Sequence, residues 1–478
     1  MTKANIKDIR RTKIVCTLGP SSETPEVIKK MMMNGMNVAR LNFSHGSHED
    51  HGKKIKIIRE LSEKLNRPVA ILQDLAGPKI RIGYIPDPGI LLQPGADIIL
   101  TTVGQEGNVK RISVSYDALP QEVKTGDRLL LADGLLELTV VETRPTEILC
   151  RVVIGGLLTS HKGINLPTGT IRTPAITEKD RRDLLFGIKN DVDYVAVSFV
   201  RTAQDIQSVK ELISRGNKDI PVIAKIEKHE AIDNLDEIIA VSDGIMVARG
   251  DLGVEIPLED VPLIQKRIIT AANARGKFVI TATQMLRSMV DSPRPTRAEA
   301  GDVANAVLDG TDAVMLSEET ASGNYPIEAI RFMDKICCAA ETGFPYRHFL
   351  EMVPQKDVSE SVAHAACVLA EHLEAKIIVS RTSSGATARF ISRFRPRQPI
   401  IALSPEPKTV RRLAMIWGCF PRLMENPDFP DDLVEKAICS LLPEGALSGK
   451  DLMVMTLGHS EWLTGSTNIL QVKRLINT

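Results

Sequence analysis

The chain has 478 residues, 43% of them hydrophobic and 25% charged, so it can bury a large core and should form two to four domains. Lysine plus arginine equals aspartate plus glutamate at 60 each, and this balance favours neither a nucleic-acid partner nor an acidic membrane surface. No apolar stretch approaches the length of a membrane span, no signal peptide is visible, and the seven scattered cysteines lack metal-ligand spacing, so we expect a cytoplasmic protein with reduced thiols.

Apolar runs without polar alternation recur along the chain, as expected for strands that are covered on both faces. The runs are Lys13–Leu18, Val38–Phe43, Val69–Leu75, Tyr194–Val200, Val222–Glu227, Gly244–Ala248, Phe278–Thr283 and Ala313–Ser317. Seven of them precede amphipathic stretches such as Glu49–Leu65 and Ile264–Ala274. Because eight β-α units close a (β/α)₈ barrel, we predict an α/β chain with a TIM barrel formed by residues 1–77 and 175–345.

The helical period disappears after the third run, between Lys79 and Pro174. Short alternating segments replace it, and Asp133-Gly134 between two of them is a hairpin signal. We therefore predict a small all-β domain, residues 78–174, inserted in a loop at the carboxyl end of a barrel strand. An insertion there is placed to act as a lid.

Charged residues lie at the carboxyl ends of two successive predicted strands. Lys225 and Glu227 end one run, and Gly250-Asp251 opens a helix after the next. Catalytic groups of such barrels lie at this end, and lysine in an apolar strand needs a charged partner. The carboxyl ends of the strands form one rim of the barrel. Two carboxylates and one ammonium on this rim suggest a hard metal ion and a cation aimed at a phosphoryl or enolate oxygen. An ion-paired rim that only stabilises the barrel is the alternative.

Two further strand ends add polar groups to this rim. Arg40–Gly46 places arginine beside Asn and Ser oxygens, which suits phosphate binding together with a second cation, although a polar helix-capping turn would look the same. Thr283 adds a hydroxyl, and the free amides near Gly250 can hold a carboxylate. The chain has neither a GxxxxGK[ST] loop nor a GxGxxG motif, so any nucleotide is held without those phosphate cradles.

A third module, residues 346–478, is predicted to be an open α/β domain. Its apolar runs Lys376–Ser380, Pro399–Leu403 and Asp451–Leu457 alternate with helical patterns. The turn Ser380–Gly385 joins a strand to a helix N-terminus, where hydroxyls and free N–H groups make an anion site. Plain N-capping is the alternative. Because this turn is far in sequence from the rim, an anion bound there would be regulatory.

Assembled in order, the segments resemble pyruvate kinase over essentially the full chain. The matching segments are Cys16-Thr17-Leu18-Gly19-Pro20, Arg40–Gly46, Gly77-Pro78-Lys79-Ile80-Arg81, Ala224-Lys225-Ile226-Glu227, Val247–Gly253, Thr281–Met285, Arg294–Glu299 and Met315–Thr320. The resemblance implies a barrel with a mobile lid and a C-terminal effector domain, and a homotetramer. It also implies phosphoryl transfer from phosphoenolpyruvate to ADP, the final step of glycolysis, with Mg²⁺ or in its place Mn²⁺.

The resemblance also assigns roles to matching residues. Glu227 and Asp251 correspond to the Mg²⁺ ligands, and Lys225 to the cation that stabilises the transferring phosphoryl group and the enolate. Arg40 corresponds to the residue that binds the phosphoryl group, Gly250 and Asp251 to those that bind the substrate carboxylate, and Thr283 to a residue near the carbon that is protonated. The residues assigned to the nucleotide are Arg40, Asn42, His45, Arg81 and Lys179. The residues assigned to the effector are Thr382, Ser383, Ser384, Gly385 and Thr387. The effector implied is a sugar phosphate or AMP.

One departure from the common family pattern concerns potassium. Asp74-Leu75-Ala76-Gly77-Pro78-Lys79 replaces the Asp-Thr-Lys-Gly-Pro-Glu that is usual in potassium-dependent members. We expect Lys79 to supply the charge of the ion, so that Asn42, Ser44 and Asp74 form only a vestigial monovalent-cation site. This places the chain with the bacterial, potassium-independent subgroup.

Two other functions remain open at this stage. A metal-dependent or Schiff-base aldolase acting on pyruvate would also carry a strand-end lysine in a barrel, although Glu227 two residues from Lys225 favours a metal site. A non-enzymatic metabolite sensor could use the Ser380–Gly385 turn alone, but the complete set of rim residues argues against it.

Overall fold

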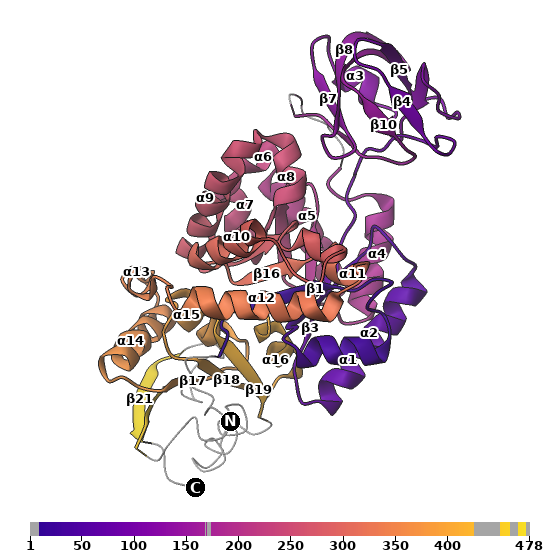
Figure 1. Ribbon diagram of the computed structural model, residues 1–478. Coiled ribbons are helices and arrows are strands. Elements are labelled where there is room, and N and C mark those ends of the chain that lie inside the picture. The colour runs from indigo at the N-terminus through magenta and orange to yellow at the C-terminus, as the bar shows by residue number, and fades with distance from the viewer. Residues whose placement is uncertain (1–8, 168, 170–173, 425–449, 459–466, 475–478) are drawn as a thin grey trace.

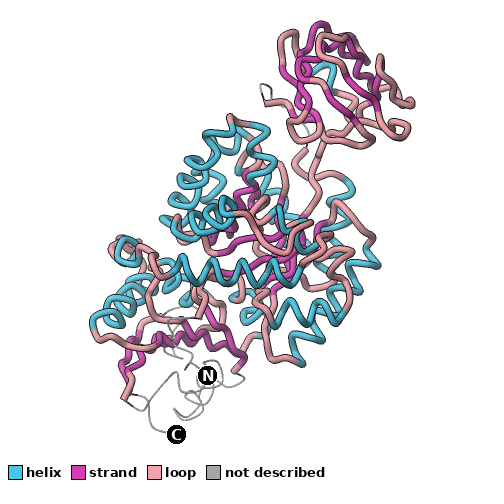
Figure 2. Tube along the Cα trace, in the orientation of Figure 1, coloured by secondary structure: helices cyan, strands magenta, loops and turns pink. Residues whose placement is uncertain are grey.

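The computed structural model describes residues 9–167, 169, 174–424, 450–458 and 467–474 (Figure 1). Its three parts follow one another in space as a β insert at one end, a barrel in the middle and an α/β layer at the other end. Helices surround the barrel strands, whereas the β insert consists almost entirely of strand and loop (Figure 2). Among the described residues, none of the helices has the length and apolar character needed to cross a membrane.

The central part is a closed barrel of parallel strands, which confirms the predicted (β/α)₈ architecture. Neighbours follow the order β1-β16-β15-β14-β13-β12-β3-β2. Nearly every position in these strands is buried, as expected for strands covered on both faces. The strands are β1 (Lys13–Thr17), β2 (Val38–Asn42), β3 (Ala70–Asp74), β12 (Tyr194–Val197), β13 (Val222–Ile226), β14 (Gly244–Ala248), β15 (Phe278–Ala282) and β16 (Ala313–Leu316).

Helices connect successive barrel strands, and several begin with side-chain caps. Thr296 and Glu299 form a capping box, so these two residues have a structural role. The helical segments of this part are α1 (Pro25–Met33), α2 (His48–Lys64), α4 (Glu178–Lys189), α5 (Ala203–Arg215), α6 (His229–Asp233), α7 (Leu235–Val241), α8 (Arg249–Glu255), η2 (Leu258–Asp260), α9 (Val261–Ala274), η3 (Arg287–Val290), α10 (Arg297–Leu308), α11 (Glu318–Ala321) and α12 (Pro326–Glu341).

The β insert lies between β3 and α4 and has its own apolar core, which confirms the predicted all-β insertion. Leu131 pairs with Leu136 across Asp133-Gly134, so the predicted hairpin is present. Most strands join one sheet in the order β11-β7-β8-β9-β5-β6. The elements are β4 (Ile90–Leu92), β5 (Asp97–Thr101), β6 (Arg111–Ser113), α3 (Leu119–Glu122), β7 (Arg128–Leu131), β8 (Leu136–Arg144), β9 (Glu147–Ile154), β10 (Gly156–Leu158) and β11 (Ile164–Asn165).

The C-terminal part is an open α/β sheet of order β19-β18-β17-β20-β21, as predicted. The sequence did not predict two of these strands, because β19 contains Pro421 and half the residues of β21 are exposed, so neither forms an apolar run. The elements are α13 (Tyr346–Leu350), α14 (Val358–His372), β17 (Ile377–Arg381), α15 (Ala386–Arg393), β18 (Ile400–Ser404), α16 (Pro407–Leu413), β19 (Cys419–Leu423), β20 (Leu452–Leu457) and β21 (Ile469–Arg474). Six described cysteines are free thiols, and Cys439 lies outside the described residues.

A buried ion pair joins the C-terminal part to the barrel. Arg395 is 2% exposed and binds Asp312, just before β16, through two hydrogen bonds of 2.8 and 2.9 Å. Its guanidinium also lies 5.0 Å from the ring centroid of Trp417. A buried pair of this kind destabilises the fold when only one partner is removed, because the remaining charge is left without compensation.

We therefore expect Arg395→Leu to lower the free energy of unfolding by about 3–5 kcal/mol, measured at the first transition in urea. The control is Arg347→Leu, since Arg347 forms an exposed pair with Glu351 and should contribute at most about 0.5 kcal/mol. Equal effects of the two substitutions would contradict the prediction.

Candidate active site

Alternation along the barrel strands directs a set of polar side chains into the barrel mouth. Successive residues of a strand point to opposite faces. Val38, Leu72 and Ile223 belong to the apolar cluster that includes the barrel interior. Two residues further along each strand, the same inward face carries Arg40, Asp74 and Lys225. The barrel interior is therefore apolar toward the amino ends of its strands and charged at their carboxyl ends.

Lys225 lies at the centre of this charged layer. Its ammonium is 2.8 Å from Oε1 of Glu227 and 3.3 Å from Oδ1 of Asp74, and it donates a hydrogen bond of 2.7 Å to Oγ of Ser198. Both carboxylates are 1% exposed. The expectation that a lysine here requires charged partners is confirmed, and the partners come from β3 and from the residue that follows β13.

Asp74 holds a second cation on its other oxygen. Nε of Arg40 donates to Oδ2 of Asp74 at 2.6 Å, and another guanidinium nitrogen donates to Oγ1 of Thr17 at 2.9 Å. One carboxylate thus stands between two cations from β2 and β13. The arrangement fixes Arg40 and Lys225 on the same side of the barrel mouth.

The three buried ionisable groups influence each other's pKa values. Burial alone lowers the pKa of Lys225, but the charges of Asp74 and Glu227 outweigh burial, and the pKa is raised overall. Burial acts to raise the pKa of Asp74, yet Lys225 and Arg40 lower it overall. The pKa of Glu227 is raised because burial exceeds the opposing effect of Lys225. The neighbouring carboxylates therefore favour the ammonium form of Lys225, and a further positive charge near Glu227 would favour its carboxylate form.

Asp251 approaches the same layer from the start of α8. Its charge contributes to the raised pKa of Glu227, so the two carboxylates share one electrostatic environment. The ammonium of Lys79 lies 3.1 Å from Oδ1 of Asp251. Two carboxylates that are each accompanied by a cation form a set of hard oxygen donors, and this set matches a divalent ion such as Mg²⁺.

The next strand end is joined to α8 by a hydrogen bond. The amide of Gly250 donates to Oγ1 of Thr283 at 2.7 Å, and this hydroxyl donates to the carbonyl of Ala282 at 2.7 Å. Thr283 and Gln284 adopt positive φ angles of 70° and 55°. Such a backbone is costly for residues other than glycine and is common at functional sites. The structure thus brings Gly250, Asp251 and Thr283 together.

Most of the predicted nucleotide residues gather at the turn after β2. The ammonium of Lys179 donates 2.6 Å hydrogen bonds to the carbonyl of Phe43 and to Asp183. Asn42 and the exposed His45 lie on either side of Phe43 in this turn. Arg81 is apart from them, since within the described residues its guanidinium binds the carbonyl of His161 in the β insert.

The position of Lys79 differs from the expected one. We expected its ammonium beside Asn42, Ser44 and Asp74, but within the described chain it pairs with Asp251 and, at 3.7 Å, with Asp133 of the β insert. The physical reason is that both oxygens of Asp74 already face Arg40 and Lys225. Asn42 instead accepts a hydrogen bond of 3.1 Å from the amide of Ser44.

The predicted anion turn of the C-terminal part begins a helix, as expected. Oγ1 of Thr382 accepts the amide of Gly385 at 2.9 Å, and Gly385 has a φ of 82° that glycine adopts without strain. Ser383 and Ser384 are exposed, whereas Thr387 is buried and its hydroxyl bonds that of Thr467. The hydroxyl of Thr382 therefore closes the turn without capping α15, whose N-cap residue is Gly385, and the exposed Ser383 and Ser384 lie just before the N-terminus of this helix.

Sequence reasoning missed Ser198 and Thr17, which bind Lys225 and Arg40. A signal was present, because both residues lie on the inward face of their strands, two positions beyond Ala196 and Val15 of the interior cluster. Extending the inward–outward alternation of each strand by one more inward position would have identified both residues.

Comparisons with known proteins match nearly the whole chain to one family. Residues 9–330 match the family model described as pyruvate kinase, barrel domain, and residues 360–473 match pyruvate kinase, alpha/beta domain. A pyruvate kinase of Clostridium acetobutylicum is 45% identical over 471 residues, which are 97% of this chain and 99% of that protein. A pyruvate kinase of Staphylococcus haemolyticus is 46% identical over 97% of this chain and 80% of its own length. Pyruvate kinase 2 of Synechocystis sp. is 46% identical, with 97% and 79% covered.

Proposed function

The chain belongs to the pyruvate kinase family, and we propose that the charged layer around Lys225 carries out the family's reaction. The protein is a phosphotransferase that passes the phosphoryl group of phosphoenolpyruvate to ADP and gives pyruvate and ATP. The observation that supports our assignment of the site is the buried ammonium of Lys225 beside Glu227. An aldolase is not favoured, because a Schiff base needs a neutral amine and the carboxylates raise the pKa of Lys225.

Glu227 and Asp251 are the residues that would hold a divalent ion, Mg²⁺ or in its place Mn²⁺. Carboxylate oxygens suit a hard cation, and the raised pKa of Glu227 reflects a buried carboxylate in need of positive charge. When bound, such an ion neutralises charge on the phosphoryl group and on the enolate. Lys79 and Lys225 balance the same two carboxylates from the protein.

Lys225 and Arg40 would stabilise the charge that moves during transfer. Phosphoryl transfer depends on positioning and on fixed positive groups rather than on covalent chemistry by the protein. Asp74 holds both cations in place through its two oxygens. The groups therefore need no rearrangement when the phosphoryl group moves between its two oxygens.

Gly250 and Thr283 would position the pyruvate part of the substrate. The amide of Gly250 donates a hydrogen bond of 2.7 Å to Thr283. A substrate carboxylate would accept the hydrogen bond of this amide in place of Thr283. Thr283 would then lie near the carbon that is protonated as enolpyruvate becomes pyruvate, with water as the relay. Asn42, His45 and Lys179 would contact ADP from the turn after β2, and Arg81 would reach it from the β insert.

We assign lid, catalytic and effector roles to the three parts of the chain. Residues 78–174 would close over the barrel formed by residues 1–77 and 175–345, and the 2.9 Å hydrogen bond that Asn165 of the insert donates to Glu255 of α8 supports a close approach of the two. Residues 346–478 would bind a phosphorylated effector, a sugar phosphate or AMP, through Thr382, Ser383, Ser384, Gly385 and Thr387. The proposed assembly is a cytoplasmic homotetramer.

A coupled assay tests the proposal directly. Pyruvate formation from phosphoenolpyruvate is followed with and without ADP and with and without Mg²⁺. Pyruvate should form only when both are present. Formation without ADP would instead mean that water accepts the phosphoryl group, and trapping of pyruvate on Lys225 by borohydride would support the Schiff-base aldolase.

The first prediction concerns Lys225. If its ammonium stabilises the transferring charge, Lys225→Met should lower kcat at least about a thousandfold, roughly 4 kcal/mol, with a much smaller change in substrate binding. Lys210→Met is the control, since Lys210 pairs with Asp243 away from the rim. A Lys225→Met enzyme with more than a tenth of the parent kcat would refute the role.

The second prediction concerns the metal ligands. Glu227→Gln and Asp251→Asn should each weaken activation by Mg²⁺, because amide oxygens bind a hard cation less strongly than carboxylates. Activity is measured as a function of Mg²⁺ concentration, with Asp133→Asn as the control for the Lys79 contact. Unchanged activation curves for both ligand variants would place the metal elsewhere.

The third prediction concerns regulation. A phosphorylated effector at the 380–385 turn should change the affinity for phosphoenolpyruvate through a coupling of about 1–3 kcal/mol. Thr382→Glu should abolish this effect, because its carboxylate repels a phosphate. Thr382→Val removes the same hydroxyl without adding charge and should retain part of the response. Equal activation of the Thr382→Glu variant and the parent by sugar phosphates and by AMP would locate the effector site elsewhere.

The fourth prediction is full activity without potassium. Lys79 already brings a positive charge to Asp251, and Asp74 faces two cations, so the rim has its positive charges from side chains. We compare kcat/KM in potassium chloride and tetramethylammonium chloride at equal ionic strength and fixed Mg²⁺. Activation by potassium beyond about tenfold, worth 1.4 kcal/mol, would contradict the prediction. A Lys79→Glu variant, which carries the residue of potassium-dependent members, should become more dependent on potassium.

A further inference from the structure

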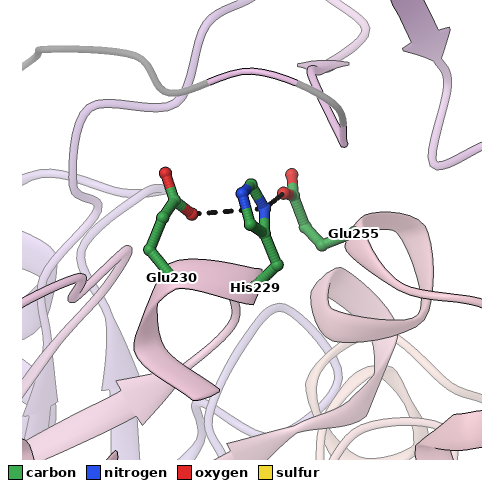
Figure 3. A group of neighbouring side chains, drawn as sticks. All are labelled: His229, Glu230 and Glu255. Carbon is green, nitrogen blue, oxygen red and sulfur yellow. Dashed lines mark hydrogen bonds and ion pairs between the residues drawn. The ribbon is translucent and has the colours of Figure 1, made fainter. Parts of the chain in front are cut away.

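Three side chains outside the rim form a compact group of metal-ligating atoms. His229 and Glu230 open α6, and Glu255 ends α8 (Figure 3). Nδ1 of His229 lies 3.3 Å from Oε2 of Glu230 and 3.4 Å from Oε2 of Glu255. One ligand atom from each residue lies within 4.8 Å of the others. Figure 3 shows the imidazole between the two carboxylates.

The hydrogen bonds available to this group leave one carboxylate unsatisfied. Both oxygens of Glu230 are buried, and neither has a hydrogen-bond partner among the described residues. Nδ1 of His229 carries at most one proton, so it can donate to only one of the two carboxylates. Buried carboxylate oxygens that accept no hydrogen bond are costly, and the only charge within 4 Å of them among the described residues is His229 at 3.3 Å. A cation bound at Nδ1 would satisfy both carboxylates at once.

The separations match those of ligands around one ion. Zn²⁺ binds imidazole nitrogen and carboxylate oxygen at about 2.0–2.2 Å with tetrahedral geometry, which places neighbouring ligand atoms roughly 3.4 Å apart. The two pairs that involve His229 measure 3.3 and 3.4 Å. Both carboxylate oxygens therefore already lie at the distance from Nδ1 that a tetrahedral ion would set.

Glu255 is also oriented as a metal ligand usually is. It is fully buried, and its Oε1 accepts hydrogen bonds of 2.7 Å from Lys228 and 2.9 Å from Asn165. These contacts leave Oε2 directed at His229. Partners that fix the second atom of a ligand are typical of metal sites, where they set the orientation of the first.

We propose that Nδ1 of His229 and one oxygen each of Glu230 and Glu255 form a binding site for Zn²⁺, separate from the rim, with water as the fourth ligand. An imidazole with two carboxylates suits Zn²⁺ better than Mg²⁺, which prefers a shell of oxygens and retains its waters. Asn165 belongs to β11 of the β insert and Glu255 to α8, so the ion would join α6 to α8 and, through Glu255, to the insert. A protonated His229 held between the two carboxylates is the competing arrangement, and it binds no ion.

The test is a calorimetric titration of the full-length protein with Zn²⁺ in excess Mg²⁺, which keeps the rim site occupied. One Zn²⁺ per chain should bind, and His229→Gln and Glu230→Gln should each weaken this binding at least tenfold. His364→Gln and Glu259→Gln remove the same chemical groups outside the cluster and should bind Zn²⁺ like the parent. Glu227→Gln should also retain the site, which separates it from the rim.

Co²⁺ provides a second measurement in the parent protein. Four-coordinate Co²⁺ should give intense visible absorption that excess Zn²⁺ abolishes and that His229→Gln lacks. Absence of bound Zn²⁺ and of this absorption in the parent would overturn the proposal and establish the group as an ion pair. Binding that survives both His229→Gln and Glu230→Gln would overturn it as well.

Discussion

The buried charges at the mouth of the barrel constrain the rest of the site. Lys225 is held between Asp74 and Glu227, and Asp74 also binds Arg40. Removing such charges from water costs several kcal/mol for each ion, so each of them needs a partner at close range. Because the partners come from β2, β3 and β13, the closed barrel itself fixes the separation of the two cations. A substrate phosphoryl group would therefore meet positive charge that is already in position, and little reorganisation would accompany its transfer.

The short helix α8 connects these charged residues to the β insert. Gly250 bonds Thr283, Asp251 pairs with Lys79, and Glu255 lies one turn beyond Asp251 on the same side of the helix. Glu255 in turn accepts a hydrogen bond from Asn165 of the β insert. Within seven residues, the helix thus carries the groups that we propose bind substrate and metal, together with a group that contacts the insert. Any movement of the insert that changes the Asn165 contact acts on the same rigid element that presents Asp251.

The sequence was sufficient for features that depend on local pattern. Buried parallel strands appear as apolar runs, and Asp133-Gly134 marks its hairpin, because the physical causes lie within a few residues. The edge strands β19 and β21 escaped prediction, since Pro421 interrupts the first and exposed residues interrupt the second, so neither forms such a run. Contacts distant in sequence were also beyond reach. The partner of Lys79 depends on how the insert joins the barrel, and the group formed by His229, Glu230 and Glu255 depends on α6 lying beside α8. The spacing of residues along the sequence predicts neither of these contacts.

The C-terminal turn and the barrel mouth are joined by continuous contacts. The carbonyl of Ser383 accepts the hydroxyl of Thr409 at 2.7 Å, and two residues further along α16 Arg411 binds Asp193 at 2.7 Å. Asp193 is fully buried and accepts the amide of Ile71 in β3 at 2.8 Å, and β3 ends at Asp74. If an effector binds the turn as proposed, a shift of α16 would act on the base of the strand whose other end holds Arg40 and Lys225. Coupling requires that effector and substrate favour the same position of a shared element, and under this proposal β3, with contacts at both ends, would be that element.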